Sequence, residues 1–383
     1  MELADSFLKH FSDMEDFRIQ NHNFRHKLKD IFIIAILGTI CGADGWLEIE
    51  RFGQAKEDWL KTFLELPNGI PSHDTFGRVF SLLDPKIFEN CFLNWLKSLT
   101  IDLTKEIIAL DGKTVRGSGN KKQKEPALHL VSAWAAKNRM MLAQVKTQDK
   151  SNEITAIPEL LKIIDVSNSV VTIDAMGCQT KIAKQIIEQK GDYVLALKEN
   201  QKSLYDNIVS IFARAEENKE KQYKKMLNLR RVEKIKNHGR IERRRYTLVS
   251  ARDPLFFALR WPGLRGIGKI DITRTVNNEV TYSTRYFLTT LEYKDIDTFM
   301  EAVRKHWQIE LDLHWSLDVS FKEDHSQVRI GHAAENLALL RRIALNLLKQ
   351  ENTMKNGITV KRKTAGWNHQ YLLKILKADQ RFT

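Results

Sequence analysis

Cysteine is scarce in this chain, which has 383 residues and only three cysteines. Cys41, Cys91 and Cys178 lie far apart and form neither a CxxC pair nor a Cys/His ligand spacing. Neither a disulfide framework nor a structural zinc site is therefore supported. This cysteine usage predicts a protein of the reducing cytoplasm.

Long apolar runs are also missing. The most apolar segment, IFIIAILGTIC from Ile31, spans 11 residues, fewer than the ~20 that cross a bilayer. We interpret it as a buried helix. The first residues, MELADSFLKHF, lack a basic stretch followed by an apolar core, so we expect no signal peptide and no membrane partner.

Several common enzyme signatures do not occur. GxGxxG, GxSxG and HExxH are absent, which removes the usual dinucleotide, hydrolase and zincin motifs. The stretch DGKT resembles the end of a phosphate-binding loop. That loop requires glycine at position 107, where Ile107 stands, so the phosphate-loop hypothesis fails.

Acidic residues are outnumbered by basic ones, 48 against 61, which gives a net charge of +13. A strongly basic balance favours a polyanionic partner, and nucleic acid is the first candidate. Basic residues are dense in LRRVEKIKNHGRIERRRY, from Leu229, and again in VKRKTAGW near the carboxyl terminus. Such segments suit a phosphate backbone, although a solvated charged face is the plain alternative.

The sequence predicts a helical region first and then a region of strands and helices. Apolar residues recur at helical spacing from Asp30 to about Leu99, with Ser72 or Asp74 as a helix cap. Strands are then predicted at 106–112, 128–137, 140–147, 169–174 and 192–198, and helices at 151–165 and 179–191. Ser151 or Asn152 would cap the first of these helices. The predicted order is three strands, helix, strand, helix, strand.

A charged segment from about 200 to 294 ends in strand patterns at 243–250, 268–276 and 279–291, and we interpret it as an insertion. The chain then returns to helix. An apolar stripe with four-residue spacing consists of Phe299, Val303, Trp307, Leu311, Trp315 and Val319. Trp307 and Trp315 are expected in the core. A second helix covers 336–351, and a strand over 311–321 is the competing prediction.

Two buried-strand patterns end on an aspartate, Asp111 and Asp174. Ligands collect at the carboxyl ends of parallel strands, so neighbouring strands would bring the two carboxylates together. Their repulsion would favour a bound Mg²⁺, and two such ions suit phosphodiester chemistry. Glu310 is the preferred third acid; its rivals are Asp312, Asp318, Glu323 and Asp324. The plain alternatives are a hairpin turn at Asp111 and a helix cap at Asp174.

The chain resembles the H-repeat-associated branch of bacterial insertion-sequence transposases, whose catalytic domain is of the DDE type. The motifs that carry the resemblance span nearly the whole chain in order: DFRIQNHNFRHKLKDI, GIPSHDTFGRVFSLLDP, IALDGKTVRGS, KSNEITAIPELL, TIDAMGCQTKIAKQI, GDYVLALKENQ, HGRIERR and HWQIELDLHWSLDVSFKED. The resemblance implies that Asp111, Asp174 and Glu310 are catalytic and bind metal.

The resemblance also implies an architecture. We expect an α/β fold with a ribonuclease-H-like core, a mixed five-stranded sheet with helices, interrupted by a β-rich insertion. Residues 1–100 would form a helical transposase-associated domain that binds DNA ends. Residues 101–383 would form the catalytic domain, with the insertion at about 200–294.

The implied activity is DNA transposition. The enzyme would bind the terminal repeats of its element in double-stranded DNA, hydrolyse a phosphodiester with Mg²⁺ (or Mn²⁺), and transfer the strand to target DNA. Synapsis of two ends implies a homodimer, and the protein would be cytoplasmic and associated with the nucleoid. Residues predicted to contact DNA are Lys113, Arg116, Lys198, Arg240, Arg244, His306 and Lys322.

The sequence departs from the family pattern around Glu310. Leu311 stands where many relatives have asparagine, and Val303, His306 and Leu317 occupy the spacings of tyrosine, arginine and lysine in the wider superfamily. Lys305, His306 or Lys322 would take over the phosphate-orienting role. Two other functions stay open: a catalytically decayed or domesticated DNA-binding copy, and a metal-dependent nuclease of defence or repair.

Overall fold

Helices dominate residues 28–98, as their apolar spacing predicts. The computed structural model describes residues 9–11, 14–18, 25–99, 101–120, 122, 124–147, 153–217, 230–237, 239–252 and 260–377. Its amino-terminal helices are α2 (Leu28–Ile40), α3 (Trp46–Ala55), α4 (Glu57–Leu60), α5 (His73–Leu82) and α6 (Pro85–Ser98). α2 carries the most apolar segment and is buried almost throughout, which confirms the predicted buried helix. Among the helices of the described ranges, none has the length and apolarity to span a bilayer.

Local caps and ring packing define this helical layer. The Ser72 hydroxyl accepts a hydrogen bond from the Thr75 backbone N–H, so Ser72 and not Asp74 caps α5. The Asp84 carboxylate caps α6 in the same way. Phe32 packs against Phe80 with ring centroids 5.1 Å apart and against Phe88 at 5.4 Å. Edge-on and tilted ring pairs of this kind stabilise a core beyond the apolar area they bury.

The predicted order of three strands, helix, strand, helix, strand is confirmed. The elements are β1 (Ile107–Val115), β2 (Leu128–Ala135), β3 (Met140–Thr147), α7 (Glu153–Ile163), β4 (Val170–Ile173), α8 (Thr180–Glu188) and β5 (Asp192–Leu197). β1 pairs in parallel with β4, and β4 with β5, while β2 and β3 are antiparallel. The proposed caps Ser151 and Asn152 lie outside the described residues.

The insertion continues this sheet instead of interrupting it. After α9 (Lys202–Glu217) come β6 (Arg230–Asn237), β7 (Arg240–Ser250), β8 (Gly266–Val276) and β9 (Glu279–Thr289). β9 pairs with the edge of β5, so the sheet has nine strands in the order β3-β2-β1-β4-β5-β9-β8-β7-β6. The five strands predicted for the core, β1–β5, are therefore present, but they belong to a larger sheet, because an exposed β5 edge pairs readily with a further strand of the insertion. β6 was not predicted, because most of its residues are charged and the alternation of apolar and polar side chains that indicates a strand is weak.

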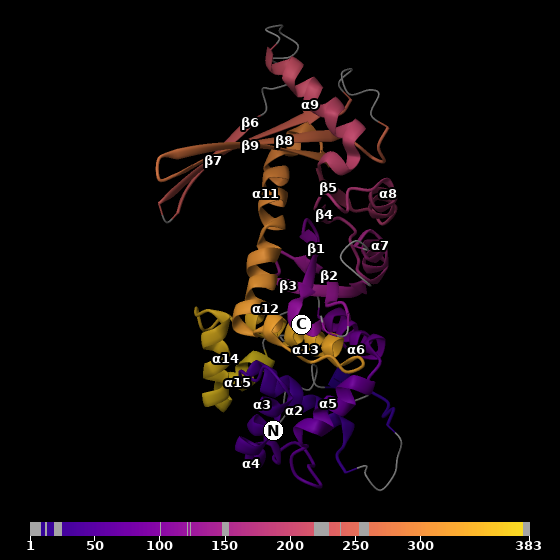
Figure 1. Ribbon diagram of the computed structural model, residues 1–383, viewed down its shortest axis with the longest axis vertical. Helices are drawn as coiled ribbons and strands as arrows, with labels where there is room; N and C mark the ends of the chain where they lie inside the picture. Colours follow the sequence, from indigo (N-terminus) through magenta and orange to yellow (C-terminus); the bar gives the residue numbers. More distant parts are fainter. Residues whose placement is uncertain are drawn as a thin grey trace.

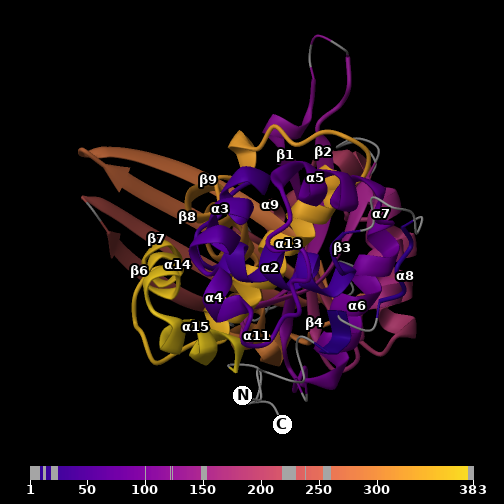
Figure 2. The same cartoon turned by 90° about the horizontal axis from the view of Figure 1, so that it is seen from below.

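The long strands β6–β9 project from the body of the molecule as an arm (Figure 1). The sheet is covered on one face by α7, α8 and α9, whose apolar residues share one core cluster with it. The other face is covered by α11 (Ile296–His306) and α13 (Ala333–Gln350). The two views together place α13 between the sheet and the amino-terminal helices (Figures 1 and 2).

α13 joins the beginning and the end of the chain through buried polar contacts. The Asn336 amide donates hydrogen bonds to the carbonyls of Phe80 and Leu83, at 2.8 and 2.9 Å. The Asn346 side chain exchanges two hydrogen bonds with the backbone of Met141 in β3. A buried amide must find such partners, so these contacts specify how α13 lies against both layers. Beyond α13, α14 (Ile358–Trp367) packs against α2, and α15 (His369–Leu376) packs against α13 and α14.

The predicted apolar stripe is buried only in its first half. Phe299 and Val303 are in the core, but Trp307 and Trp315 are 47% and 57% exposed, which contradicts their predicted core role. The cause is a π-helical turn, η6 (Ile309–His314), between α11 and α12 (Trp315–Ser320). A π-turn holds more residues than an α-turn, so the buried positions leave the predicted stripe and lie two residues away from it, at Ile309, Leu313 and Leu317. The competing strand over 311–321 is also wrong.

Glu89 on α6 is a partly buried carboxylate whose raised pKa predicts that the stability of the protein depends on pH. Its Oε1 atom has no hydrogen-bond partner among the described residues, and burial raises its pKa from 4.5 to about 7. Because the folded protein holds this proton more tightly than the unfolded chain, stability falls as pH rises from about 4.5 to about 7. We expect Glu89→Gln to raise the free energy of unfolding above this window by up to about 3 kcal/mol.

Urea unfolding of the wild type and Glu89→Gln, at acidic and at mildly basic pH, measures this effect. Glu159→Gln is the control, because the Glu159 side chain is 58% exposed. A difference between wild type and Glu89→Gln that does not change with pH would contradict the assignment.

Candidate active site

Asp111 and Asp174 come together at the end of one parallel strand pair. β1 pairs with β4 from Ile107 opposite Val170 to Leu110 opposite Ile173. Each aspartate is the next residue after this last pair. The two strands are therefore neighbours, which meets the condition under which the sequence analysis brought the two carboxylates together, and both aspartates follow the same end of the parallel pairing.

β1 does not end at Asp111, which corrects the sequence-based expectation. The strand continues to Val115 and pairs antiparallel with β2, with Asp111 opposite Ser132 and Gly112 opposite Val131. The hairpin-turn alternative for the DG pair is wrong for the same reason. Asp174 does not cap α8 either: its Oδ1 accepts backbone hydrogen bonds from Met176 and Gly177 within the loop.

Gly112 is required by a close approach of side chains to the backbone of β1. A Cβ atom there would lie 2.2 Å from Glu153 Oε1 and 2.7 Å from His129 Nε2. These two atoms share a hydrogen bond of 2.8 Å, and His129 Nδ1 bonds Thr114 Oγ1 at 2.8 Å. Glu153, in the first turn of α7, is therefore a buried partner of His129.

We expect Gly112→Ala to lower the free energy of unfolding by about 1–3 kcal/mol, because the added methyl overpacks a filled site. It should also reduce activity, since Asp111 is the adjacent residue. Thermal unfolding measures the stability change. Gly357→Ala is the control, because a Cβ at Gly357 would meet no atom within 4 Å. Equal melting temperatures for the two variants would refute the packing argument.

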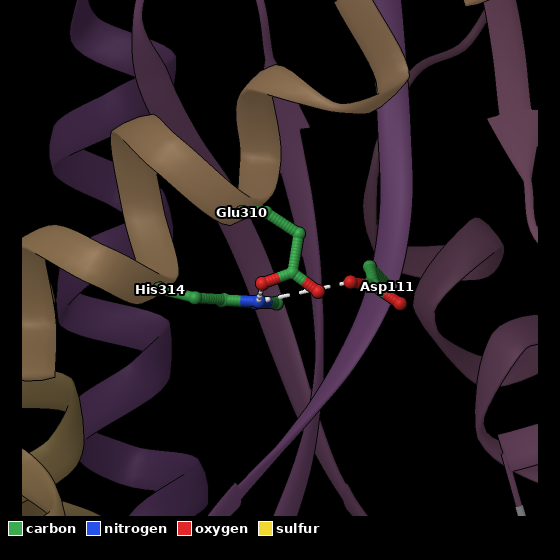
Figure 3. Close-up of side chains that lie close together, drawn as sticks. All are labelled: Asp111, Glu310 and His314. Carbon is green, nitrogen blue, oxygen red and sulfur yellow. Dashed lines mark ion pairs between the residues drawn. The ribbon is translucent and has the colours of Figure 1, made fainter. Parts of the chain in front are cut away.

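Glu310 reaches Asp111 from the π-helical turn. In Figure 3 its carboxylate and the His314 ring both point toward Asp111 on β1. His314 Nδ1 lies 3.4 Å from Glu310 Oε2 and 3.6 Å from Asp111 Oδ2. The turn brings Glu310 and His314 to the same side, so one short segment supplies both groups. The structure thus places the preferred third acid beside Asp111.

One cavity contains all three predicted acids. Its lining includes Asp111, Asp174 and Glu310, together with Lys198 and Arg285. Burial, with Glu310 and Asp174 adding negative charge, raises the pKa of Asp111 from 3.8 to about 6 despite the opposing effect of His314. The hydrogen bond with His314 lowers the pKa of Glu310.

The cluster fits a divalent cation. Ligand atoms of Asp111, Glu310 and His314 all lie within 4.8 Å of one another. Two carboxylates in a partly buried site repel each other, and a cation between them relieves that repulsion. Oxygen ligands with one imidazole suit Mn²⁺ well, and carboxylates alone suit Mg²⁺. Asp174 lines the same cavity but lies outside this tightest group.

The rival acids have other partners. Asp312 bonds Lys349 at 2.9 Å, and Asp318 pairs with Lys113 at 2.7 Å. Glu323 is fully buried against Arg342 at 2.7 Å. Asp324 lies 3.1 Å from Lys113. None of these four carboxylates lines the cavity that holds Asp111.

Lys113 and Arg116 differ from the predicted DNA contacts. Lys113 is 7% exposed and its ammonium is surrounded by Asp318, Glu323 and Asp324. A lysine so enclosed is not positioned to reach a phosphate, which argues against its predicted role. Arg116 is exposed and pairs loosely with Asp324 at 3.3 Å, so its guanidinium remains accessible.

The other predicted cations are scattered. Lys198 is exposed and lines the acid cavity. His306 also lines it, but its Nδ1 bonds Thr172 Oγ1 at 3.0 Å, and burial lowers its pKa to about 4, so it is neutral at physiological pH. Lys322 is paired with Asp44 at 3.3 Å and does not line the acid cavity. Arg240 and Arg244 both bond Glu242 on the arm.

The chain matches known protein families over most of its length. Residues 102–347 match the family described as "Transposase DDE domain", and residues 8–96 match "DDE_Tnp_1-associated". The "H repeat-associated putative transposase YhhI" of Escherichia coli K12 is 37% identical, over 98% of both chains. The "Putative transposase YncI" of Escherichia coli O157:H7 is 40% identical over 97% of this chain and 94% of its own.

A solved structure of the piggyBac transposase synaptic complex with hairpin DNA covers 99% of this chain and 78% of its own, at 10% identity and a TM-score of 0.40. That likeness is too distant to carry an argument. The family match covers most of the chain, and the relatives align over nearly its full length. The chain therefore belongs to the H-repeat-associated branch of the DDE transposase family and is a DNA transposase.

Proposed function

We propose that this transposase recognises the ends of its own element, hydrolyses a phosphodiester there, and joins the freed 3′ hydroxyl to target DNA. One observation carries the proposal: Asp111, Asp174 and Glu310, far apart in sequence, line the same cavity. Asp111 and Asp174 come from adjacent parallel strands, and Glu310 comes from the helix that crosses them. In this proposal the three acids are the catalytic carboxylates.

Membership of the DDE family implies a divalent metal cofactor and DNA as the partner. We propose Mg²⁺, with Mn²⁺ as a substitute, held by Asp111, Asp174 and Glu310. The bound metal supplies the positive charge that offsets the carboxylates and the charge developing on the phosphate. His314 lies close enough to share in holding it.

The remaining groups of the cavity position the substrate. The two backbone N–H groups that bond Asp174 Oδ1 hold this carboxylate in place. Lys198 and Arg285 contribute the positive side chains of the lining, and they suit a phosphate oxygen. His306 is neutral and bonded to Thr172, so it contributes a polar surface and no charge. Catalysis then rests mainly on positioning and on charge stabilisation.

The architecture is proposed to be ribonuclease-H-like. Supporting this, β3, β2 and β1 form an antiparallel meander, and β4 and β5 extend it in parallel. We propose residues 1–100 as an end-binding helical domain and 101–383 as the catalytic domain, with the arm inserted at about 200–294. Pairing of two element ends would require a homodimer.

Cleavage of a labelled duplex that carries the end of the element, in the presence of Mg²⁺ or Mn²⁺, tests the proposal. We expect metal-dependent nicking at the end and none on an unrelated duplex. Equal cleavage of both duplexes would indicate a general nuclease. Binding without cleavage under any metal would indicate a decayed DNA-binding copy.

A further inference from the structure

A groove lined by arginines lies on the arm, on the side that faces α11. We call it the arginine groove and define it by Arg240, Arg244, Arg274 and Arg285 with Glu242, Tyr246 and Trp307. Arg274 and Arg285 were not singled out by the sequence, since they lie on different strands. The pairing of β7, β8 and β9 brings them together.

Strand register explains why the arginines share one face. Arg240, Glu242 and Arg244 alternate along β7, so they point to the same side. Glu242 is opposite Arg274 of β8, and Tyr246 is opposite Ile270, which in turn is opposite Arg285 of β9. The same face carries Arg231 and Glu233 of β6, which pair with Asp297 and Arg304 of α11. The arginine groove therefore faces α11.

The groove has more positive than negative charge. Glu242 is 2% exposed and pairs with Arg240, with Arg244 at 2.5 Å and with Arg274 at 3.4 Å. Arg285 lies over the Trp307 ring at 4.9 Å, and no carboxylate of the described residues pairs with it. The groove thus holds four guanidinium groups and one carboxylate, which leaves an excess of about three positive charges. Such crowding is costly unless a further anion binds.

The arginine groove is continuous with the acid cavity. Arg285, Val303 and Trp307 line both. Trp307 stands at the junction, three residues before Glu310, and its ring is 47% exposed. A polymer whose reacting phosphate occupies the acid cavity has a direct path from there into the groove.

We propose that the arginine groove binds phosphates of the DNA strand next to the cleaved phosphodiester, with Arg285 at the junction. The inference rests on the proposed function, because that function places the reacting phosphate in the acid cavity. Guanidinium groups suit phosphates, since their planar fork donates two hydrogen bonds at once. Arg240 and Arg244 are about 13 Å apart along β7, which is enough for separate phosphates. Glu242 holds them in place before DNA arrives.

The experiment compares two double variants with the same change of charge on the same strand. Arg240→Gln/Arg244→Gln removes two arginines from the groove. Arg243→Gln/Arg245→Gln removes two from the opposite face of β7, because the side chains alternate. Affinity of the full chain for a labelled duplex carrying the end of the element is measured by fluorescence anisotropy over a range of salt concentrations.

We expect the groove variant to bind the duplex about tenfold more weakly than the wild type. The salt slope is the slope of log K against the logarithm of the salt concentration. Its magnitude should fall by about 2, close to one for each lost phosphate contact. The opposite-face variant should keep the wild-type slope. Equal slopes for the two variants, or a larger change for the opposite-face variant, would overturn the proposal. Ethylation of phosphates next to the cleavage position should weaken binding by the wild type and not by the groove variant.

A single substitution, Arg274→Gln, tests the same groove in case the double variant does not fold. In Arg274→Gln, Glu242 keeps its pairs with Arg240 and Arg244, so we expect native thermal unfolding and a slope lower by about 1. An unchanged slope in this folded variant would also overturn the proposal. If the wild type cleaves the element end but the slopes do not differ, the groove fails and the proposed function stands. If the salt slopes of the groove and opposite-face variants differ but no metal ion enables the wild type to cleave the element end, the arginine groove stands and the proposed cleavage reaction fails.

Discussion

Asp111→Asn is expected to reduce metal-dependent cleavage of the element end by at least about a thousandfold, which corresponds to about 4 kcal/mol of lost transition-state stabilisation. Asp174→Asn and Glu310→Gln should act similarly, because all three carboxylates line one cavity. Each substitution is nearly isosteric and removes one negative charge. The loss would therefore reflect the charge and not a change in packing.

The same variant should make the folded protein more stable. Burial raises the pKa of Asp111 to about 6 from its ordinary 3.8, so ionised Asp111 destabilises the fold at neutral pH. Asparagine removes that cost, which is about 3 kcal/mol. This gain in the free energy of unfolding should be absent below about pH 4 and complete above about pH 6, because the pKa of Asp111 is 3.8 in the unfolded chain and about 6 in the folded protein.

Thermal unfolding with and without Mn²⁺ supplies a readout other than cleavage. A ligand that binds only the folded state raises the melting temperature. We expect Mn²⁺ to stabilise the wild type but not Asp111→Asn or Glu310→Gln. Asp297→Asn is the control, since Asp297 is on α11 but is 67% exposed and pairs with Arg231. Full cleavage activity in Glu310→Gln would remove Glu310 from the site.

Arg342→Met is expected to lower the free energy of unfolding by about 3–5 kcal/mol, because it leaves the Glu323 carboxylate buried without its main partner. Both side chains are fully buried, and Arg342 Nη1 lies 2.7 Å from Glu323 Oε1. The same nitrogen also donates to the Ala338 carbonyl at 3.0 Å. Lys113 lies 3.6 Å from the other carboxylate oxygen and cannot replace the lost contact.

The double variant Glu323→Leu/Arg342→Met tests this explanation. Replacing both charges by apolar groups removes the uncompensated ion, so we expect most of the lost stability to return. Urea unfolding at neutral pH measures all three proteins. A double variant as unstable as Arg342→Met would show that the cost comes from packing and not from the unpaired charge.

The contribution of this ion pair to the free energy of unfolding should depend on pH. Burial raises the pKa of Glu323, but the charges of Arg342 and Lys113 outweigh it, so the net pKa is below 4.5. A lowered pKa gives stability that is present above about pH 4.5 and is lost as pH falls further. The difference between wild type and Arg342→Met should shrink on acidification.

Local patterns in the sequence were enough for the order of elements up to β5. The strands around Asp111 and Asp174 were predicted because buried strands need apolar runs, and α2 because its run was too short for a membrane. The end of β1 was misplaced, since DG is a common turn. Only the approach of His129 and Glu153 explains a glycine inside that strand.

The region around Glu310 shows where sequence patterns fail. A four-residue apolar spacing predicted an unbroken helix that buries Trp307 and Trp315. The π-helical turn shifts the register, exposes both rings and brings Glu310 and His314 toward Asp111. A π-turn is stabilised by its tertiary contacts, so the local spacing of apolar residues does not predict it.

By itself, the sequence determined the basic charge, the strand and helix order of the core, the two apolar runs that end on Asp111 and Asp174, and the family resemblance. The tertiary structure decided the rest: the sheet that runs on into the arm, the enclosure of Lys113 by carboxylates, and the arginine groove. The reason is physical. Periodicity records which face of an element is buried, whereas partners far apart in sequence are chosen by pairing and packing of the whole chain.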